Sequence, residues 1–392
     1  MKKRSLFLLA LICAATLAVA CGKQKAAETS GSAASGTEST TVASSETAVA
    51  EAARRTVTDD SGAVTEIPEK IDRIVVGDVF PMASVLSVYL GSADKIVGIH
   101  PVSMSAAQNG LLGDLYPEIL KAETGFAKGN ELNVEEVMKL NPDIVIGVTK
   151  DNAEALRNAG IPAICVIPSK YNFDVIATYE QWISLLDQIF GGSEKTAQIE
   201  AYSRKAYEMV QERVGSLKEE EKKRVLVLFR YDDSGMVASG KNFFGQYWTD
   251  AVGAINVAAE IPDGKTVQIN MEQVYQWNPD LILITNFTGT QPEDLYENRI
   301  GSDDWSKVKA VQNHEVYKMP LGIYRTFTPG ADTPVTLQWL AKTVYPEKFA
   351  DLDIDRITRE YFAQYYNVGL TDEMLKKMYN PSKQAAEGMV KK

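Results

Sequence analysis

Two carboxylates occupy the same place in a repeated segment of this 392-residue chain. Residues 133–143 and 270–280 match at six of eleven positions, and the repeat places Glu135 and Glu272 at the same offset in the two copies. In each copy an Asn can cap a short helical run, and Asn-Pro-Asp ends that run before an apolar segment. Paired carboxylates can serve as the acid and base of a hydrolase, or they can form charge-assisted bonds to arginines of a partner.

Other side chains suited to binding follow the short apolar runs of the chain. Ligands of α/β lobes lie beyond the carboxyl ends of the strands, so residues directly after such runs are candidates for ligand contacts. They offer aromatic rings for stacking, cations for an anionic ligand, and hydroxyl, amide or imidazole groups. These ligand-binding candidates are Phe80, His100, Lys150, Tyr231, Asn286, Tyr324 and Arg325. Only His100 and Tyr231 among them are candidates for a direct bond to a metal.

The elements that must position these residues alternate between strands and helices. Short apolar runs separated by segments of helical length or spacing indicate buried parallel strands. The runs are 74–76, 96–99, 144–148 and 163–167, and then 225–229, 281–285 and 316–319. Between the two groups, residues 193–217 keep three-and-four apolar spacing and predict one long helix.

We therefore predict an α/β fold of two Rossmann-like lobes joined by one long helix, with a ligand cleft between the lobes. The N-terminal lobe is assigned to residues 56–190 and the bridging helix to 191–222. The C-terminal lobe, with its C-terminal helices, is assigned to 223–392.

The amino terminus has the order of residues found in a bacterial export signal. Three basic residues at 2–4 precede an uncharged run of 15 residues, 6–20, which is short for a membrane span. Small residues then precede Cys21, and this resembles the lipobox of bacterial lipoproteins. We expect residues 1–20 to be a lipoprotein signal peptide and Cys21 to carry the lipid. Residues 21–55 are rich in Ala, Ser and Thr and predict a disordered tether.

Composition narrows the classes of function. The formal net charge of −11 disfavours nucleic-acid binding. Two histidines and three cysteines exclude cysteine-rich zinc modules and sites built from three histidines, and no cofactor is expected. Cys165 lies in an apolar stretch and is expected to be a buried core thiol without a disulfide partner.

Taken together, these pieces resemble the substrate-binding lipoproteins of bacterial ABC importers for iron-siderophores, haem and cobalamin. The resemblance covers about residues 55–349 and rests on the opening hairpin, on both Asn-Pro-Asp strands, and on Asp-Thr-Pro-Val at 332–335. It implies a non-enzymatic monomer, anchored by lipid to the outer face of the cell membrane, that delivers its ligand to an ABC permease dimer and its ATPase. It also implies that Glu135 and Glu272 dock on permease arginines.

Three kinds of ligand fit this resemblance. A ferric siderophore ranks first, because it is usually anionic and already chelated, and it needs cations and aromatic rings more than direct metal donors. Haem would need an axial Tyr or His, which Tyr231 or His100 could supply. Cobalamin would need an apolar aromatic cleft. The alternative from another class is an exported carboxylate-dependent hydrolase, which would require Glu135 and Glu272 to converge to ~5–10 Å.

Overall fold

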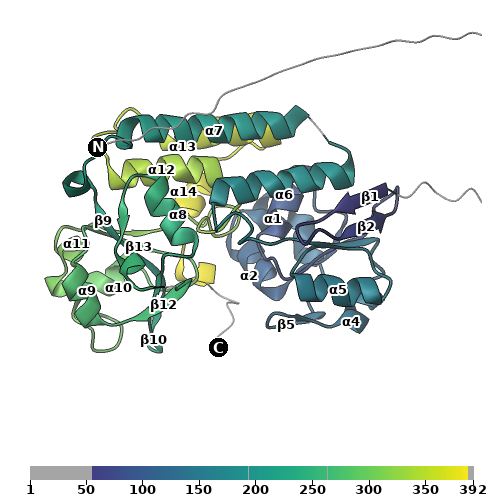
Figure 1. Ribbon diagram of the computed structural model, residues 1–392, viewed down its shortest axis with the longest axis horizontal. Coiled ribbons are helices and arrows are strands. Elements are labelled where there is room, and N and C mark those ends of the chain that lie inside the picture. The colour runs from purple at the N-terminus through teal and green to yellow at the C-terminus, as the bar shows by residue number, and fades with distance from the viewer. Residues whose placement is uncertain (1–54, 193, 263, 387–392) are drawn as a thin grey trace, which may run out of the picture. The chain divides into compact units, whose positions relative to one another are not determined.

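The computed structural model describes residues 55–192, 194–262 and 264–386. The predicted signal peptide, Cys21 and nearly all of the predicted tether lie outside the described residues. The described chain has the predicted α/β fold, with one main sheet in each of two lobes (Figure 1).

The first lobe contains a four-stranded parallel sheet in the order β4-β3-β7-β8. Its strands are short and rich in Val and Ile because helices cover both faces, and nearly every strand residue is buried. The predicted amino-terminal hairpin precedes the sheet as an antiparallel pair. The strands are β1 (Arg55–Thr58), β2 (Val64–Ile67), β3 (Ile74–Val76), β4 (Ile96–Gly98), β7 (Ile144–Val148) and β8 (Ala163–Cys165), with a small ribbon of β5 (Ala127–Lys128) and β6 (Glu131–Leu132).

The helices of this lobe connect the strands in sequence. They are α1 (Met82–Leu90), α2 (Pro101–Asn109), α3 (Leu112–Leu115), the 3-10 turn η1 (Pro117–Lys121), α4 (Val134–Lys139) and α5 (Lys150–Asn158).

The second lobe contains a mixed sheet in the order β12-β10-β9-β13-β14, with β11 beside β9. The central strands β9, β13 and β14 are parallel, whereas β10 and β12 add an antiparallel edge. The strands are β9 (Arg224–Asp232), β10 (Gly235–Ser239), β11 (Ile255–Asn256), β12 (Thr266–Ile269), β13 (Leu281–Ile284) and β14 (Val316–Lys318). The helices and turns are η2 (Glu219–Glu221), α8 (Phe244–Ala251), η3 (Val257–Glu260), α9 (Met271–Trp277), α10 (Pro292–Tyr296), η4 (Trp305–Lys307), α11 (Lys309–Gln312) and α12 (Thr333–Val344).

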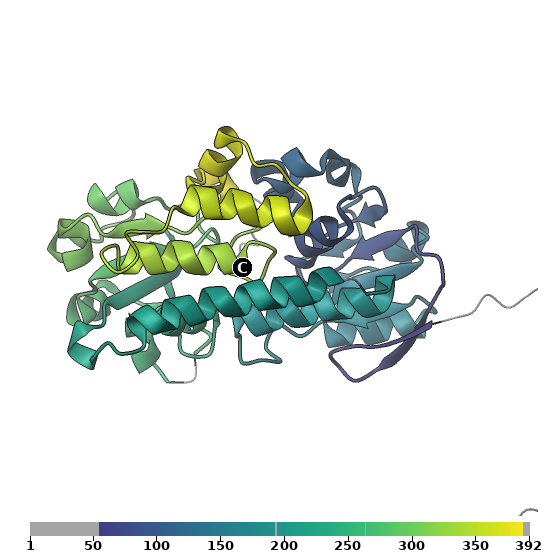
Figure 2. The same cartoon turned by 90° about the horizontal axis from the view of Figure 1, so that it is seen from above.

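The predicted long helix is α7 (Glu194–Val214), and α6 (Val175–Phe190) runs beside it (Figures 1 and 2). Both helices belong to two hydrophobic clusters. On α6, Trp182 packs in the first-lobe cluster and Val175 in the second-lobe cluster. On α7, Ile199 packs in the first-lobe cluster and Val210 in the second-lobe cluster. The bridge is therefore a pair of helices, each packed into both lobes.

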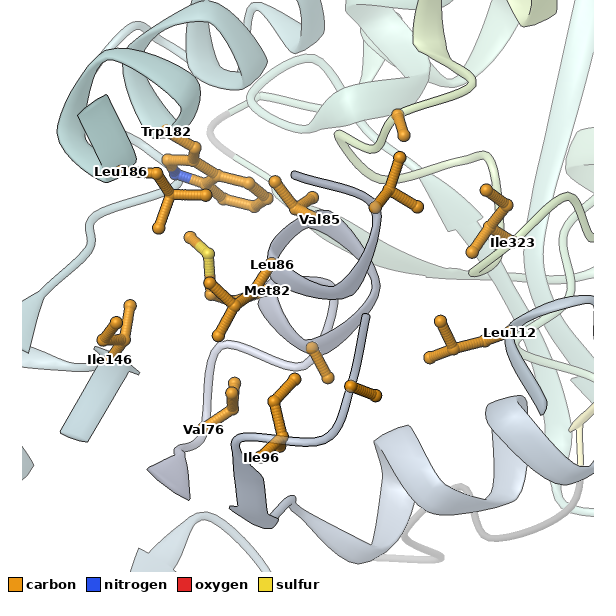
Figure 3. Packing of buried hydrophobic residues seen from close by; sticks show 14 of the residues in the cluster. Val76, Met82, Val85, Leu86, Ile96, Leu112, Ile146, Trp182, Leu186 and Ile323 are labelled. Carbon is orange, nitrogen blue, oxygen red and sulfur yellow. The ribbon is translucent and has the colours of Figure 1, made fainter. Parts of the chain in front are cut away.

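The chain also returns to the first lobe at its carboxyl end. The helices α13 (Ile354–Tyr366) and α14 (Asp372–Tyr379), which the sequence analysis assigns to the second lobe, place Phe362 and Met378 in the first-lobe cluster. Figure 3 shows the centre of this cluster, where Leu86 of α1 packs near Trp182, and Ile323 from the second-lobe segment reaches the same core.

The sequence repeat is also a repeat of structure. In the first lobe the Asp143 carboxylate accepts from the amide N–H of Arg73, just before β3, and the Arg73 side chain donates to the carbonyl of Leu140. In the second lobe Asp280 accepts from the amide N–H of Arg224, at the start of β9. Each Asn-Pro-Asp therefore ties the end of a helix to the strand on which the lobe is built, which explains why this turn is repeated.

The buried Asp59 holds the amino-terminal hairpin against β8, and its removal should destabilise the protein. The Asp59 carboxylate is fully buried; it pairs with Arg157 at 2.6 Å and accepts from the amide N–H of Cys165 at 2.9 Å. Breaking a buried pair leaves one charge uncompensated, so Asp59→Ala should lower the free energy of unfolding by about 3–5 kcal/mol in urea titrations. The control Asp72→Ala removes exposed ion pairs with Lys70 and Lys95 and should change the urea midpoint little. Equal losses in the two variants would contradict the role given to Asp59.

Candidate ligand-binding site

A cavity of about 750 Å³ lies at the carboxyl ends of β9 and β13 in the second lobe. This is the edge where the parallel strands of an α/β lobe present ligand-binding residues. Its lining includes Arg230 and Phe287 from the two strand ends, and Arg299 from the segment after α10. Such a volume is in the range of pockets that hold a drug-sized organic molecule.

Arg325, Tyr324 and Asn286 come together beside this edge. Arg325 is fully buried; its Nε donates to the Asn286 carbonyl at 3.1 Å and its Nη1 to the Tyr324 hydroxyl at 3.3 Å. The guanidinium also lies 5.5 Å from the Phe287 ring centroid, and Nη1 donates to the Val102 carbonyl of the first lobe at 3.5 Å. The predicted cation therefore sits where the second lobe meets α2, between aromatic rings.

Asn286 is held in place by its side-chain amide nitrogen. The nitrogen donates to the carbonyls of Met319 and Pro320 at 2.8 and 3.0 Å. Its side-chain oxygen is buried and has no hydrogen-bond partner among the described residues. A buried acceptor is costly to leave unsatisfied, so this oxygen is suited to receive a hydrogen bond from a ligand or a water molecule.

His100 is a structural residue at the start of α2. Its Nδ1 accepts from the amide N–H of Val102, so Nε2 carries the proton and donates to the Gly129 carbonyl at 2.8 Å. Its ring lies 4.4 Å from that of Phe80, which is half-buried. Burial lowers the pKa of His100, which favours the neutral imidazole. Both nitrogens are engaged, so this geometry offers no free nitrogen for a direct metal bond.

Tyr231 contributes to the cavity wall, but its hydroxyl points into a hydrogen-bond network of the lobe. The hydroxyl donates to the Asp303 carboxylate at 2.8 Å and accepts from the Trp305 indole N–H at 3.1 Å. Burial and the Asp303 carboxylate raise the pKa of Tyr231. This arrangement stabilises the neutral phenol and disfavours the phenolate that would bind iron.

Lys150 lies apart from these residues. It is the first residue of α5, is exposed, and lies 3.9 Å from Glu154 on the same helix. It does not line the 750 Å³ cavity.

Two lysines that were not predicted from the sequence lie at the cavity. Lys318 is buried behind its wall and donates to the carbonyls of Thr288 and Thr290 at 2.6 and 2.7 Å. Burial lowers the pKa of Lys318 to about 7. A lysine within an otherwise apolar strand is unusual, and it indicates a buried amino group that bonds to neighbouring carbonyls. Lys383, near the carboxyl end, lines the cavity itself, and its polar surroundings in the sequence give no signal.

The repeated carboxylates lie on short surface helices away from the cavity lining. Glu135 is in the first turn of α4 and Glu272 in the first turn of α9; both are exposed, and neither makes a hydrogen bond or ion pair with another described residue. One turn further along, each helix also exposes a large apolar side chain, Met138 at 52% and Tyr275 at 37%. The two lobes thus present the same combination of a carboxylate and an apolar side chain.

Two further observations concern metals and membranes. Among residues 55–192, 194–262 and 264–386, no group of three or more His, Cys, Asp or Glu side chains is arranged to hold a metal ion. Within the same ranges, no helix combines the length and apolar character needed to cross a membrane.

Two α/β lobes with shared helices and a cavity at the strand ends are the arrangement of a solute-binding protein. The model of the Periplasmic binding protein family matches residues 74–321, and the chain belongs to this family. Members are substrate-binding components of ABC importers rather than enzymes.

Known proteins match over most of the chain. It is 25% identical over 339 residues to the molybdate-binding protein MolA of Haemophilus influenzae, covering 80% of this chain and 91% of MolA. It is 24% identical over 324 residues to an iron-uptake system-binding protein of Bacillus subtilis, covering 81% and 90%. A periplasmic solute-binding protein structure from Veillonella parvula is 28% identical with a TM-score of 0.75, covering 84% of this chain and 97% of that one.

The buried His100 should make stability depend on pH. Because burial lowers its pKa below the ordinary 6.5, the unfolded chain binds a proton that the folded chain does not, and stability should fall as pH drops below that value. The His100→Asn variant keeps an acceptor for the α2 amide and should lose less unfolding free energy than the parent between about pH 7.5 and 5.5. The control His314→Asn, in an exposed turn, should behave like the parent. Identical pH profiles for parent and His100→Asn would contradict the assignment.

Proposed function

We propose that this protein captures a chelated iron compound, a ferric siderophore before others, and delivers it to an ABC permease. The observation that carries the proposal is the cavity of about 750 Å³ at the second-lobe strand ends, with an aromatic ring and two arginines in its lining. Rings and guanidinium groups recognise the organic shell and negative charge of a chelate.

The hydrogen bonds of His100 and Tyr231 favour a chelate over haem as the ligand. His100 uses both ring nitrogens within the first lobe, and the Tyr231 hydroxyl is bonded to Asp303 and Trp305. A ligand that brings its own donor atoms does not require these groups to be released.

A tetrahedral oxyanion is the second candidate, because MolA is a relative over most of both chains. The buried Arg325 is a cation of the kind that oxyanion sites use alongside backbone N–H donors. The cavity volume favours the chelate, since a bare oxyanion would leave most of the 750 Å³ unfilled.

The order of residues at the amino terminus supports an exported, lipid-anchored location. Export by the signal peptide at 1–20 and lipidation of Cys21 would leave the folded part anchored to the outer face of the cell membrane on the 21–55 tether. A monomer on such a tether can present both lobes to one permease dimer, whose ATPase supplies the energy.

Docking is assigned to Glu135 and Glu272. Each is exposed without a partner among the described residues, and each lies beside an exposed apolar residue, Met138 or Tyr275. Two equivalent surface elements on two lobes suit the two halves of a permease dimer, where carboxylate–arginine bonds fix the orientation.

Titration with a panel of ligands tests the choice of cargo. We expect the purified protein to bind an anionic ferric chelate at micromolar concentration or lower. We expect it to leave the Soret band of added haem unshifted, since His100 and Tyr231 are both hydrogen-bonded within the protein. Calorimetry and visible spectra would record this, with molybdate as the third ligand. A Soret band shifted from that of free haem, or binding of molybdate alone, would contradict the iron-chelate proposal.

Removing both docking carboxylates should separate transport from binding. The double variant Glu135→Ala/Glu272→Ala should lower uptake by at least about tenfold, because charged pairs with the permease are lost, while ligand affinity stays unchanged. The matched control is Glu136→Ala/Gln273→Ala, the next position in both copies of the repeat. Normal uptake by the first variant, or an equal loss in the control, would contradict the docking assignment.

A further inference from the structure

The last described turn of the chain, η5 (Lys383–Ala386), lies between the two lobes. It packs against α2 of the first lobe, and both Lys383 and Ala386 line the second-lobe cavity. In Figure 1 this yellow end of the chain lies between α2 and the strands of the second lobe. The carboxyl end therefore occupies the side of the cavity that faces the first lobe.

An ion pair holds this turn in place. The Lys383 ammonium lies 3.2 Å from the Asp294 carboxylate, which is only 6% exposed and also lies 3.6 Å from Arg299. The second oxygen of Asp294 accepts from the amide N–H of Gln291 at 2.9 Å, which fixes the carboxylate at the start of α10. The carboxylate that pairs with Lys383 is therefore itself held in place at the start of α10.

A backbone contact supports the ion pair. Gly289 approaches the turn so closely that a Cβ built on it would lie 3.6 Å from the Lys383 carbonyl oxygen. The buried Lys318 holds the carbonyls on both sides of Gly289, those of Thr288 and Thr290. Lys318 therefore anchors the loop that faces the carboxyl-terminal turn.

The charges around the cavity show what Lys383 contributes. The lining carries three cationic side chains and three carboxylates, and one of the cations is Lys383. Without it, the carboxylates would outnumber the cations and the lining would repel an anionic ligand. With Lys383 the charges of the lining balance, so the carboxyl-terminal turn cancels a net negative charge that would oppose an anionic ligand.

We propose that the carboxyl-terminal turn is a wall of the ligand cavity and that Lys383 is a specificity-determining residue that admits anionic ligands. This rests on the proposed function of capturing a solute at the second-lobe strand ends. The ligand class it selects is an organic chelate with negative charge, because the wall adds both a cation and an enclosing surface.

Affinities for two matched probes test the role of the charge. Lys383→Ala should weaken binding of an anionic ferric tricatecholate by about five- to tenfold, as expected for one partly exposed charge, and leave a neutral ferric trihydroxamate within about twofold. The control Lys377→Ala removes another carboxyl-terminal lysine that is paired to an aspartate, Asp114, outside the cavity, and should change neither affinity. An equal fall for both probes, or no fall for the tricatecholate, would overturn the role of Lys383.

A crosslink tests the position of the wall without any ligand. The pair Gly289→Cys/Lys383→Cys should form a disulfide under mild oxidation, since a side chain fits at Gly289 and Cys165 is buried. Mass spectrometry after proteolysis would identify the bond, and its absence would overturn the inference whatever the protein binds. If neither chelate binds the parent protein, the iron-chelate function fails, and the crosslink alone then decides whether the turn forms the wall.

Discussion

Apolar cores shared across the two lobes constrain everything else in this structure. The helices α6, α7 and α12 each contribute side chains to both the first-lobe and the second-lobe cluster, and α13 and α14 return to the first. Separating the lobes widely would expose these side chains to water, at roughly 25 cal/mol for each Å² of apolar surface. Helices packed in this way bend less than strand hinges. The carboxyl ends of the strands beside the cavity can therefore move only slightly.

Because the frame is rigid, the charges and hydrogen bonds at the carboxyl ends of the second-lobe strands determine what can bind there. Arg325 spans from the second-lobe loop to the Val102 carbonyl of α2, so one buried guanidinium contacts both lobes. Lys318 holds the Thr288–Thr290 loop through two carbonyls, and burial lowers its pKa to about 7. Buried cations persist only where oxygen atoms surround them, and here those oxygens belong to the loops that shape the cavity.

The sequence was informative where a physical rule acts locally. The repeat, the short strands and the long helix α7 were predictable because capping, turn chemistry and apolar periodicity depend on neighbouring residues. Tyr231 shows where such reasoning ends. Strict alternation along β9 would place it on the same face as Val227 and Phe229, but Val237 opposes Arg230 while Ala238 opposes Leu228, so Phe229 is the extra residue of a bulge. The bulge turns Tyr231 into the cluster that contains Leu228.

Lys383 was unpredictable for a different reason, since only the folded chain brings it to Asp294, 89 residues away in sequence.

The hydrogen-bond partners of the polar side chains at the strand ends indicate what kind of ligand the site can recognise. The imidazole of His100 caps α2, and the phenol of Tyr231 ties β9 to the segment around Asp303, so both stabilise the walls. Groups left for a ligand at the cavity are the half-buried Phe287 and the cations of the lining, and the buried oxygen of Asn286 behind them has no partner among the described residues. A ligand of the proposed chelate class would be recognised in such a site by its outer surface and charge, without a direct bond to its central atom. Relatives with the same frame can therefore carry different solutes, because the frame fixes the edge and a few exchangeable side chains set the selectivity.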